Sequence, residues 1–426
     1  MTEATVTEAV PEAGDWDQRL RPDIVLGAPL RQGDTVVHYL KDPRTGWYYR
    51  LGSREFFLAS RLDGRHSREE IEQAYADRFG RRLTPAHWDS LFQLLRTRQL
   101  LTGGAEAGLD ELKAKAQRER RSGRWRLLYA RIPLVDPDPF LRWLAARAGA
   151  IYSPWFVLPA LLAAALAVGI GLADLPALYA ASRMNVGHPL AIVSFTTTWL
   201  VVALHEAAHG LTSRRFGGAV TEMGLMWRFP LITPYCKTDD VVLFAKRRHR
   251  VYTAFAGVFV NLLALVPFAA AWKLSTPGTH GHALAGSLLL YGMLTAGLNL
   301  LPLLRLDGYF MLNHAIGMAD LRREAYRFWG AVLRQRGVGA YRRADRWAYG
   351  VYGLAMFALF GAMLCGIVGV WYWSLNRWIG PVGAVALLST EAVLVAALIV
   401  FLNRRRARKR ALRESGEAGD ETRRRP

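Results

Sequence analysis

The sequence predicts an all-α polytopic membrane protein of about six transmembrane helices, preceded by a small α+β domain. Three observations lead to this prediction. First, 52% of the 426 residues are hydrophobic, a larger share than most soluble proteins carry. Second, six apolar runs of about 20 residues follow residue 150, and every other connection between them is rich in Lys and Arg. Third, residues 22–104 show the short mixed patterns of a folded soluble domain.

The chain in front of the membrane region divides into a tail and a small domain. Residues 1–21 begin with acidic residues and lack an apolar core, so we expect a disordered tail and not a secretory signal. In residues 22–104, the runs TVVHYL and GWYYRL predict two strands joined by the turn-forming DPRT. Three helical segments follow, with Ser67 and Glu70 as a capping box and Thr84 as a second N-cap.

Two strands and three helices in this order favour a winged-helix-like fold for the front domain. Such folds bind DNA in many proteins, but none of the three helices is strongly basic and the domain is tethered to a membrane. A peptide is therefore the favoured partner. Residues 105–150, by contrast, are expected to form a basic cytosolic linker.

The membrane domain is predicted to cover residues 151–402. Its six spans are expected at 151–173, 189–212, 251–272, 283–304, 347–373 and 381–402. The basic connections hold 10, 8, 8 and 10 Lys or Arg (residues 113–147, 213–250, 313–346 and 404–425), whereas the others hold one each, Arg183, Lys273 and Arg377. The positive-inside rule then places both termini in the cytoplasm. The net charge of +20 thus follows from topology, without a nucleic-acid partner.

Two segments outside the spans are strongly basic. Residues 319–345 mix aromatic and aliphatic residues with arginines, as a helix on the inner headgroup surface does, although a solvated linker explains the composition equally well. Residues 403–426 lack apolar periodicity, so we expect a basic disordered tail. The preference for Arg over Lys favours a bacterial source, and hence a multi-pass protein of the bacterial inner membrane.

The stretch VVALHEAAHG, residues 201–210, places three ionisable groups inside an apolar run. On a helix, His205 and His209 lie one turn apart on one face and can bind one metal ion. Glu206 is their neighbour and can deprotonate a water that the metal activates. Ionisable groups within a span are costly unless they serve a site, so a purely structural role for the three is disfavoured.

Catalytic zinc takes three protein ligands and keeps one position open, so a third ligand is needed. Asp307, in LNLLPLLRLDGYF, ends a span that runs in the same direction as the span of the histidines and lies at the same depth. Pro302 and Gly308 loosen the chain around it, which is tolerated where backbone lines a cavity. We therefore expect one Zn²⁺ per chain, held by the two histidines and Asp307. The alternative is that Asp307 is an interfacial carboxylate paired with Arg305.

Together these motifs resemble the site-2 protease family of intramembrane zinc metalloproteases. The matching elements are HEAAH in one span, A-G-x-x-x-N ending at Asn261 in the next, and N-x-x-P-x-x-x-L-D-G from Asn299 to Gly308. Some members have a second proline where this chain has Leu304, which affects local backbone shape and not the ligand set. The resemblance implies that Asn299 helps to hold the substrate backbone beside the metal and that Asn261 contributes to the cavity. Each asparagine could instead be a polar contact between helices.

Between the second and third spans, the stretch GGAVTEMGLMWRFPLITPYCKTDD alternates in polarity and contains Gly and Pro breaks. This pattern favours a hairpin dipping toward the site, similar to the membrane-associated β-segment of the family. An edge strand there can hold an extended substrate by β-augmentation. Cys236 and Asp239 flank the segment and would be surplus as metal ligands, so we assign them structural roles.

The sequence favours a zinc metalloendopeptidase that hydrolyses peptide bonds of a membrane-associated protein or precursor peptide near the cytoplasmic face. Residues 22–104 also resemble PqqD-like recognition elements, which implies that this domain binds the leader of a ribosomally made peptide by adding it as a strand. The alternative is a non-proteolytic membrane accessory for binding, maturation or export of such a peptide. An intact Glu206 favours the enzyme, because a chain that has lost catalysis is expected to lose this base first.

Overall fold

The computed structural model describes residues 18–102, 110–112, 114, 129–184, 187–228, 231–335 and 337–423. Residues 1–17 of the expected tail, residues 103–104 at the end of the expected front domain, and residues 105–109, 113 and 115–128 of the expected linker lie outside the described residues. The chain divides into two compact units, residues 1–350 and 351–426, and each is described by itself.

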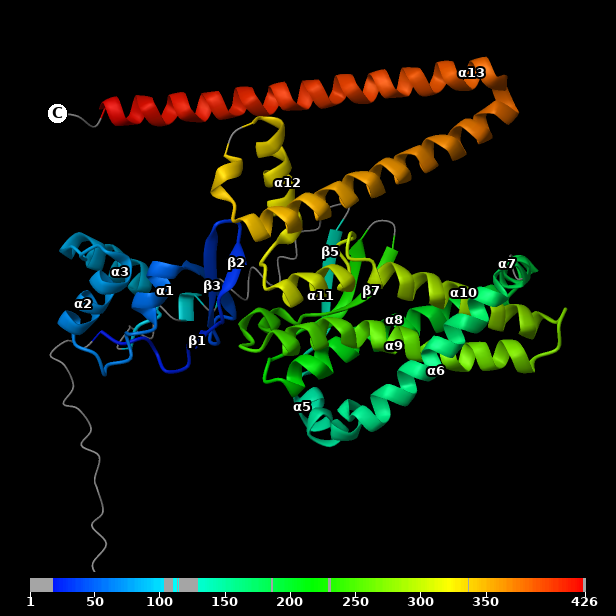
Figure 1. Cartoon of the computed structure of the whole chain (residues 1–426), viewed down its shortest axis with the longest axis horizontal. Coiled ribbons are helices and arrows are strands. Elements are labelled where there is room, and N and C mark those ends of the chain that lie inside the picture. The colour runs from blue at the N-terminus through cyan, green and yellow to red at the C-terminus, as the bar shows by residue number, and fades with distance from the viewer. Residues whose placement is uncertain are drawn as a thin grey trace, which may run out of the picture. The chain divides into compact units, whose positions relative to one another are not determined.

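The front domain combines a four-stranded antiparallel sheet with three helices (Figure 1). Its strands are β1 (Val25–Leu26), β2 (Leu30–Gln32), β3 (Thr35–Asp42) and β4 (Trp47–Gly52), and its helices are α1 (Ser53–Ala59), α2 (Arg68–Phe79) and α3 (Pro85–Thr97). The two predicted strands are β3 and β4, and the three predicted helices are all present. Strands β1 and β2 were not expected, because two or three residues are too few to show a period of two.

Strand β3 is the centre of this sheet, with β4 on one side and both short strands on the other. The turn between β3 and β4 is held by Asp42, whose carboxylate accepts hydrogen bonds from Thr45 Oγ1 at 2.7 Å and from the Arg44 N–H at 3.1 Å. Arg21 pairs with the same buried carboxylate. The domain therefore begins before residue 22, because Arg21 is itself buried.

The helix starts of the front domain follow the predicted caps. Ser67 Oγ accepts from the Glu70 N–H at 3.2 Å, and Glu70 Oε2 accepts from the Ser67 N–H at 2.9 Å, which is a complete capping box. Thr84 is the N-cap of α3, and its N–H donates to His87 Nδ1 at 3.2 Å. The sheet and helices enclose one apolar core around Leu40, which is fully buried.

Five helices in the described residues are long and apolar enough to cross a membrane. They are α6 (Pro154–Ala173), α8 (Leu190–Arg215), α9 (Arg247–Leu274), α10 (His280–Leu300) and the long α13 (Arg343–Arg423), whose apolar part runs to Arg405. The first four coincide with predicted spans. Helix α9 is central among them, because it packs against α6, α8 and α10 (Figure 1).

Helix α13 covers the last two predicted spans, which accounts for five long helices where six spans were expected. The helix is interrupted at Gly380, which has φ 72° and ψ 173° and is followed by Pro381. Only glycine adopts such a backbone conformation without strain, and proline cannot donate to the preceding turn, so the two residues separate two helical halves. The structure describes residues 403–423 as helix, so the expected disorder of this tail is wrong there. Its Arg, Ala and Glu residues are good helix formers.

Two further expectations are corrected in the membrane region. Residues 129–135 form strand β5 (Tyr129–Val135), and residues 138–147 form helix α5 (Asp138–Arg147), although both fall in the expected linker. Strand β5 pairs with the predicted hairpin of β6 (Met223–Arg228) and β7 (Leu231–Cys236) in a three-stranded antiparallel sheet. The membrane domain is therefore not all-α. Strand β5 gains its partner from residues about 95 positions later, which no local pattern indicates.

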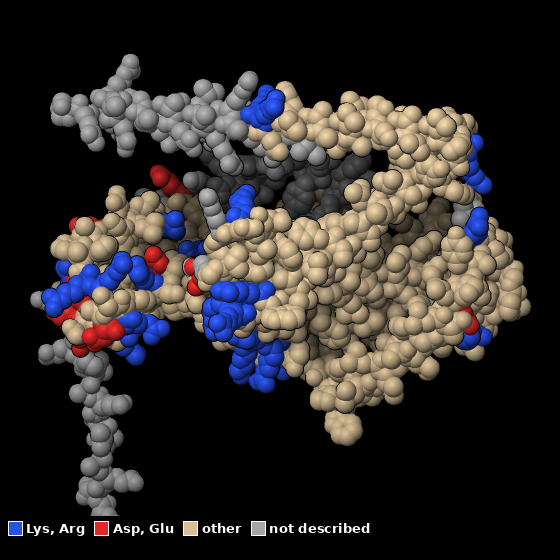
Figure 2. Space-filling view, turned by 45° about the horizontal axis from the view of Figure 1, so that its top comes forward, with Lys and Arg blue, Asp and Glu red and all other residues tan. Residues whose placement is uncertain are grey.

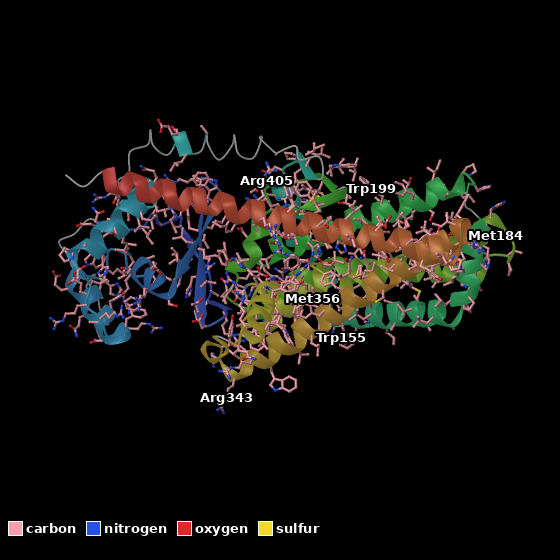
Figure 3. All side chains as sticks on the ribbon, turned by 90° about the horizontal axis from the view of Figure 1, so that it is seen from above. Trp155, Met184, Trp199, Arg343, Met356 and Arg405 are labelled. Atoms are coloured by element: carbon pink, nitrogen blue, oxygen red, sulfur yellow. The ribbon has the colours of Figure 1, made fainter. Side chains whose placement is uncertain are left out.

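The remaining helices connect these elements. Helix α7 (Leu175–Met184) follows α6 directly, and Trp155 and Met184 mark the two ends of this α6–α7 segment (Figure 3). Short 3₁₀ helices η1 (Ala148–Tyr152), η2 (Asp239–Leu243) and η3 (Val338–Ala340) lie at turns, and α11 (Asp307–Ile316) and α12 (Leu321–Leu333) follow α10. Figure 2 shows a broad surface without charged side chains, with Lys and Arg gathered at its ends, as expected of helices that cross a bilayer.

The front domain is fastened to the membrane region by a buried cluster around Asp240 of η2. This carboxylate accepts from Lys41 Nζ at 2.6 and 2.7 Å and from the Tyr48 hydroxyl, and also from the Ala219 N–H at 2.7 Å. A second contact joins strand β2 to the end of α11, where the Arg31 N–H donates to the Gly317 carbonyl at 3.0 Å. The first contact follows strand β7, which lies against α8, and the second follows helix α11, which begins at Asp307.

Candidate metal centre

Helix α8 places His205 and His209 one turn apart on a buried face, with exposed fractions of 6% and 8%. The run from Leu190 is apolar and contains neither Gly nor Pro until Gly210, so the helix continues through the motif. It ends at Arg215, and Gly217 follows with a φ of 92°, a conformation that commonly terminates helices.

Asp307 reaches the histidines from another part of the chain. Helix α10 ends at Leu300, two residues before Pro302, and α11 begins at Asp307 after a run of turns. A Cβ added at Gly308 would collide with the Leu300 carbonyl, so only glycine allows the chain to fold back this closely. This fold-back delivers the Asp307 carboxylate to the face of α8.

The three side chains meet in a compact group. Asp307 Oδ2 lies 3.0 Å from His205 Nε2, Asp307 Oδ1 lies 3.3 Å from His209 Nε2, and the two Nε2 atoms are 3.1 Å apart. Within the described residues, these three form the group of His, Cys, Asp or Glu side chains that could hold a metal ion. The sequence-predicted ligand set is thus brought together in space.

The donor set fits a tetrahedral ion. Zinc binds histidine nitrogen and carboxylate oxygen at about 2.0–2.2 Å, and ligands at that distance in a tetrahedral arrangement lie roughly 3.3 Å apart. The observed separations of 3.0–3.3 Å match this value. In the alternative that pairs Asp307 with Arg305, the carboxylate would contact the guanidinium, whereas its contacts here are the two imidazoles.

The second ring nitrogen of His209 has its own partner. His209 Nδ1 lies 2.7 Å from the Thr253 carbonyl of α9, and an N–H donated there leaves Nε2 as the atom with a lone pair. His205 Nδ1 is buried and has no hydrogen-bond partner in the described part of the chain. The Thr253 contact was not expected from the sequence, because any residue can supply a backbone carbonyl.

Gly257 is where α9 lies against the site. A Cβ added there would lie 2.6 Å from His205 Nε2 and would overlap His209 Nε2. The missing side chain therefore leaves room at the point where the two imidazoles converge. The A-G-x-x-x-N stretch contains this glycine, but the pattern does not show which atoms the glycine faces.

Glu206 follows His205 directly on α8, and its carboxylate reaches strand β7. Its Oε2 accepts from the Cys236 N–H at 3.1 Å, so the end of the strand orients the carboxylate. Burial raises the pKa of the Cys236 thiol to about 12, and the nearby Glu206 carboxylate adds to the shift. A thiol of this kind stays protonated, which agrees with a structural role for Cys236.

Strand β7 is an edge of its sheet and lies against α8. Trp199 of α8, labelled in Figure 3, donates its indole N–H to the Ile232 carbonyl at 3.2 Å. In antiparallel pairing, alternate residues turn both backbone groups away from the partner strand, and Ile232, Pro234 and Cys236 share this orientation. Pro234 is tolerated because the position faces away from β6.

The two asparagines occupy different surroundings. Asn261 is 4% exposed and lines a small cavity of about 10 Å³ together with Thr198 and Thr295. That volume has room for roughly one water molecule. Asn299 is half-buried in the last turn of α10, and its carbonyl O would lie 3.0 Å from a Cβ at Gly308. In the described part of the chain, neither side chain makes a hydrogen bond to His205, His209 or Asp307.

Comparison of the chain with protein-family profiles, curated proteins and solved structures finds no match.

Proposed function

We propose that this chain is an intramembrane zinc metalloendopeptidase, similar to the site-2 proteases, that cuts a membrane-associated protein or a precursor peptide near the cytoplasmic face. The observation that carries the proposal is the convergence of His205 and His209, on the apolar helix α8, with Asp307 at the start of α11, and with Glu206 next to His205 in the chain. Two imidazoles and a carboxylate are the ligand type of catalytic zinc, which leaves one position open. A structural zinc site would have closed all four positions with protein ligands.

In this proposal, His205, His209 and Asp307 hold one Zn²⁺, and the ion supplies Lewis-acid activation of water and of the scissile carbonyl. Glu206 is the general base: its carboxylate takes the proton of the attacking water and passes it to the leaving amine. The hydrogen bond from Cys236 keeps this carboxylate on the side of the strand. The hydrogen bond to the Thr253 carbonyl holds His209 in the tautomer whose Nε2 is free to bind a metal.

The edge of strand β7 supports a role in holding the substrate. An extended peptide laid along this edge would run beside Glu206, because both the Ile232 carbonyl and the Cys236 N–H face α8. A helical peptide bond is shielded by its own hydrogen bonds, so a substrate must be extended before attack. The indole of Trp199 occupies part of this edge and would have to release it.

The front domain is proposed to recruit the substrate, as the resemblance to PqqD-like recognition elements suggests. Its attachment through Asp240 and through the end of α11 joins it to the segments that follow β7 and α11. We further propose a location in the bacterial inner membrane, with both termini in the cytoplasm, on the basis of the Lys and Arg distribution.

The deciding experiment compares wild type with Glu206→Gln in the native host and as purified full-length protein. We expect the variant to keep one zinc per chain by elemental analysis and to lose at least about a hundredfold in cleavage, since general bases contribute roughly 10²–10⁴. An uncleaved protein or peptide then accumulates in the variant strain by quantitative proteomics. Glu391→Gln, which changes an exposed carboxylate of α13, is the control and should behave as wild type.

Two results would overturn the proposal. Wild-type protein without zinc would remove the metal from the function altogether. If the Glu206→Gln strain matches wild type while deletion of residues 22–104 impairs peptide export, the chain is a non-proteolytic accessory and the front domain is its working part.

A further inference from the structure

A basic cleft lies between the end of α10 and helix α12, outside the metal centre. It has a volume of about 710 Å³, within the usual range of 300–1,000 Å³ for small-molecule sites. Five arginines line it: Arg305, Arg322, Arg323, Arg327 and Arg334. Asp320 is the acidic residue of the lining. So strong an excess of guanidinium groups selects an anionic ligand.

Helix α12 presents two distinct faces. Leu321, Glu324, Ala325 and Phe328 are buried, at the spacing of one helical face. Arg323, Arg327, Gly330 and Arg334 follow one another at intervals of three or four residues and form another face, which lines the cleft. A Cβ added at Gly330 would meet nothing within 4 Å, so this glycine is a gap in the arginine row. A mid-helix glycine with no packing reason costs about 1 kcal/mol relative to alanine.

The carboxylates near the cleft are already engaged. Asp320 caps α12 by accepting from the Arg323 N–H at 3.3 Å, and it also accepts from the Tyr309 hydroxyl at 2.8 Å. Glu324 is buried and pairs with Arg327 at 2.8 Å. Arg305, Arg323 and Arg334 have no ion pair with a carboxylate among the residues that the structure describes. Three positive charges of the cleft are thus left for a ligand.

The depth of the cleft points to the kind of ligand. Helix α10 has 21 residues and is therefore about 32 Å long at 1.5 Å per residue, close to the roughly 30 Å of a hydrocarbon core. Arg305 follows its last residue by five positions, which places the cleft at the headgroup level on the side rich in Lys and Arg. Leu333 and Tyr326 of α12 are 78% and 39% exposed, so apolar side chains flank the arginines.

We propose that this cleft binds the phosphate headgroup of an anionic phospholipid from the inner leaflet. Guanidinium groups bind phosphate oxygens in bidentate geometry, and Arg305, Arg323 and Arg334, which lack a carboxylate partner among the described residues, line the same cleft as candidate phosphate ligands. The exposed Leu333 and Tyr326 contact the first part of the acyl chains. Basic pockets beside membrane helices on the cytoplasmic side are suited to such lipids. The bound lipid stabilises the segment that leads from Arg305 to Asp307. This proposal does not depend on whether the chain is a peptidase.

The test uses the purified full chain and measures retained lipid by native mass spectrometry. Dioleoyl phosphatidylglycerol and dioleoyl phosphatidylcholine are the probes, because they share acyl chains and differ in headgroup charge. We expect wild type to bind phosphatidylglycerol at least about tenfold more tightly than phosphatidylcholine. Arg323→Gln combined with Arg334→Gln removes two unpaired guanidinium groups and should weaken phosphatidylglycerol binding about tenfold. Neither side chain takes part in the metal centre.

Two further variants complete the design. Gly330→Leu fills the gap in the arginine row without losing charge, and it should weaken phosphatidylglycerol binding while the folded protein keeps its thermal stability. Arg81→Gln combined with Arg82→Gln removes two exposed arginines of the front domain and is the matched control. Its affinity should stay within about twofold of wild type.

Several outcomes would overturn the proposal. Equal binding of the two lipids by wild type would show that headgroup charge is not recognised. Equal losses in the Arg323/Arg334 variant and in the Arg81/Arg82 control would indicate a general charge effect. Complete displacement of phosphatidylglycerol by millimolar inorganic phosphate would identify a soluble anion as the ligand, and displacement by a polyglutamate peptide would identify an acidic peptide.

Discussion

Gly257 sets how closely helix α9 approaches His205 and His209, two of the proposed metal ligands. A methyl group at this position would lie 2.6 Å from His205 Nε2 and would overlap His209 Nε2, so one or both imidazoles must move. Metal sites require ligand positions within a few tenths of an ångström. Gly257 is therefore expected to matter for the proposed metal site, although it contributes no donor atom.

We predict that Gly257→Ala abolishes stoichiometric zinc binding while the protein remains folded in detergent. Elemental analysis of the purified variant measures the loss, and circular dichroism checks the fold. Gly297→Ala on α10 is the matched control, since a Cβ there meets nothing within 4 Å and alanine favours the helix. A Gly257→Ala protein that still carries one zinc per chain with unchanged affinity would show that the histidines do not converge as described.

His314 of α11 makes stability depend on pH. Burial lowers the pKa of this imidazole from 6.5 to about 4, and the nearby Arg250 adds to the shift. Its Nδ1 is buried and has no hydrogen-bond partner in the described part of the chain. The unfolded chain therefore binds a proton near pH 6.5 that the folded chain accepts only near pH 4. Stability is complete above about pH 7 and falls as the pH drops through this window.

We predict that wild type loses about 2 kcal/mol more than His314→Gln between pH 7 and pH 5. Denaturant titration in detergent at the two pH values measures the difference. The control is His66→Gln, which removes an exposed imidazole of the front domain. If the stability of wild type and of His314→Gln falls in parallel, proton binding by His314 does not limit acid stability.

At the scale of elements, the two attachments of the front domain follow β7 and α11. Strand β7 ends at Cys236, whose N–H orients Glu206, and Asp240 lies four residues further on. Helix α11 begins at Asp307. At its C-terminal end, the Gly317 carbonyl accepts a hydrogen bond from the Arg31 N–H of β2. Movement of the front domain would therefore act on the segments that carry Cys236, which orients the proposed base Glu206, and Asp307, the proposed third ligand.

We predict that Lys41→Met loosens this attachment and lowers the free energy of unfolding by about 3 kcal/mol. The reason is that Asp240 is only 7% exposed at its side chain, and a buried ion pair that loses one partner costs roughly 3–5 kcal/mol. Thermal unfolding measures the change. Arg44→Met breaks the more exposed pair with Asp23 and should cost no more than about 1 kcal/mol. Similar effects of both substitutions would mean that the Lys41 contact does not hold the domains together.

At the scale of the whole molecule, the topology decides to which side of the membrane the proposed metal site is nearer. Arg248 lies at the start of helix α9, next to a connection rich in Lys and Arg. Thr276 follows the other end of the helix, where Lys273 is the one basic residue of the connection. The positive-inside rule assigns Arg248 to the cytoplasm and Thr276 to the opposite side. On this assignment the proposed metal site lies nearer the cytoplasmic face, because Gly257, which faces the two histidines, is closer in α9 to Arg248 than to Thr276.

We predict that a cysteine at Thr276 reacts with a membrane-impermeant maleimide in intact cells, whereas a cysteine at Arg248 reacts only after the membrane is opened. Both substitutions are made in a protein whose two native cysteines, Cys236 and Cys365, are replaced by serine. Both positions are exposed, so accessibility within the fold does not bias the comparison. The reverse labelling pattern would place the metal centre near the outer face.

The sequence by itself determined the features that depend on local pattern. The apolar runs predicted the membrane helices, the spacing of His205 and His209 predicted a shared face, and Ser67 with Glu70 predicted a capping box. These succeed because helix length, helical periodicity and capping each depend on residues within a few positions of one another. The pairing of α8 with Asp307, about 100 residues later, was also anticipated, since the second and fourth predicted spans run in the same direction and were expected to place the two groups at the same depth.

Only the tertiary structure decided what depends on distant partners. Strand β5 exists because β6 pairs with it, and a strand without a partner has no period strong enough to reveal it. The approach of Gly257 to the imidazoles, the carbonyl of Thr253 and the N–H of Cys236 involve backbone atoms or a missing side chain, which residue type does not report. The basic cleft likewise arises because the end of α10 and helix α12 bring their arginines together in space. Features that depend on neighbouring residues can be predicted from the sequence, whereas the distances between residues far apart in the chain are set by packing.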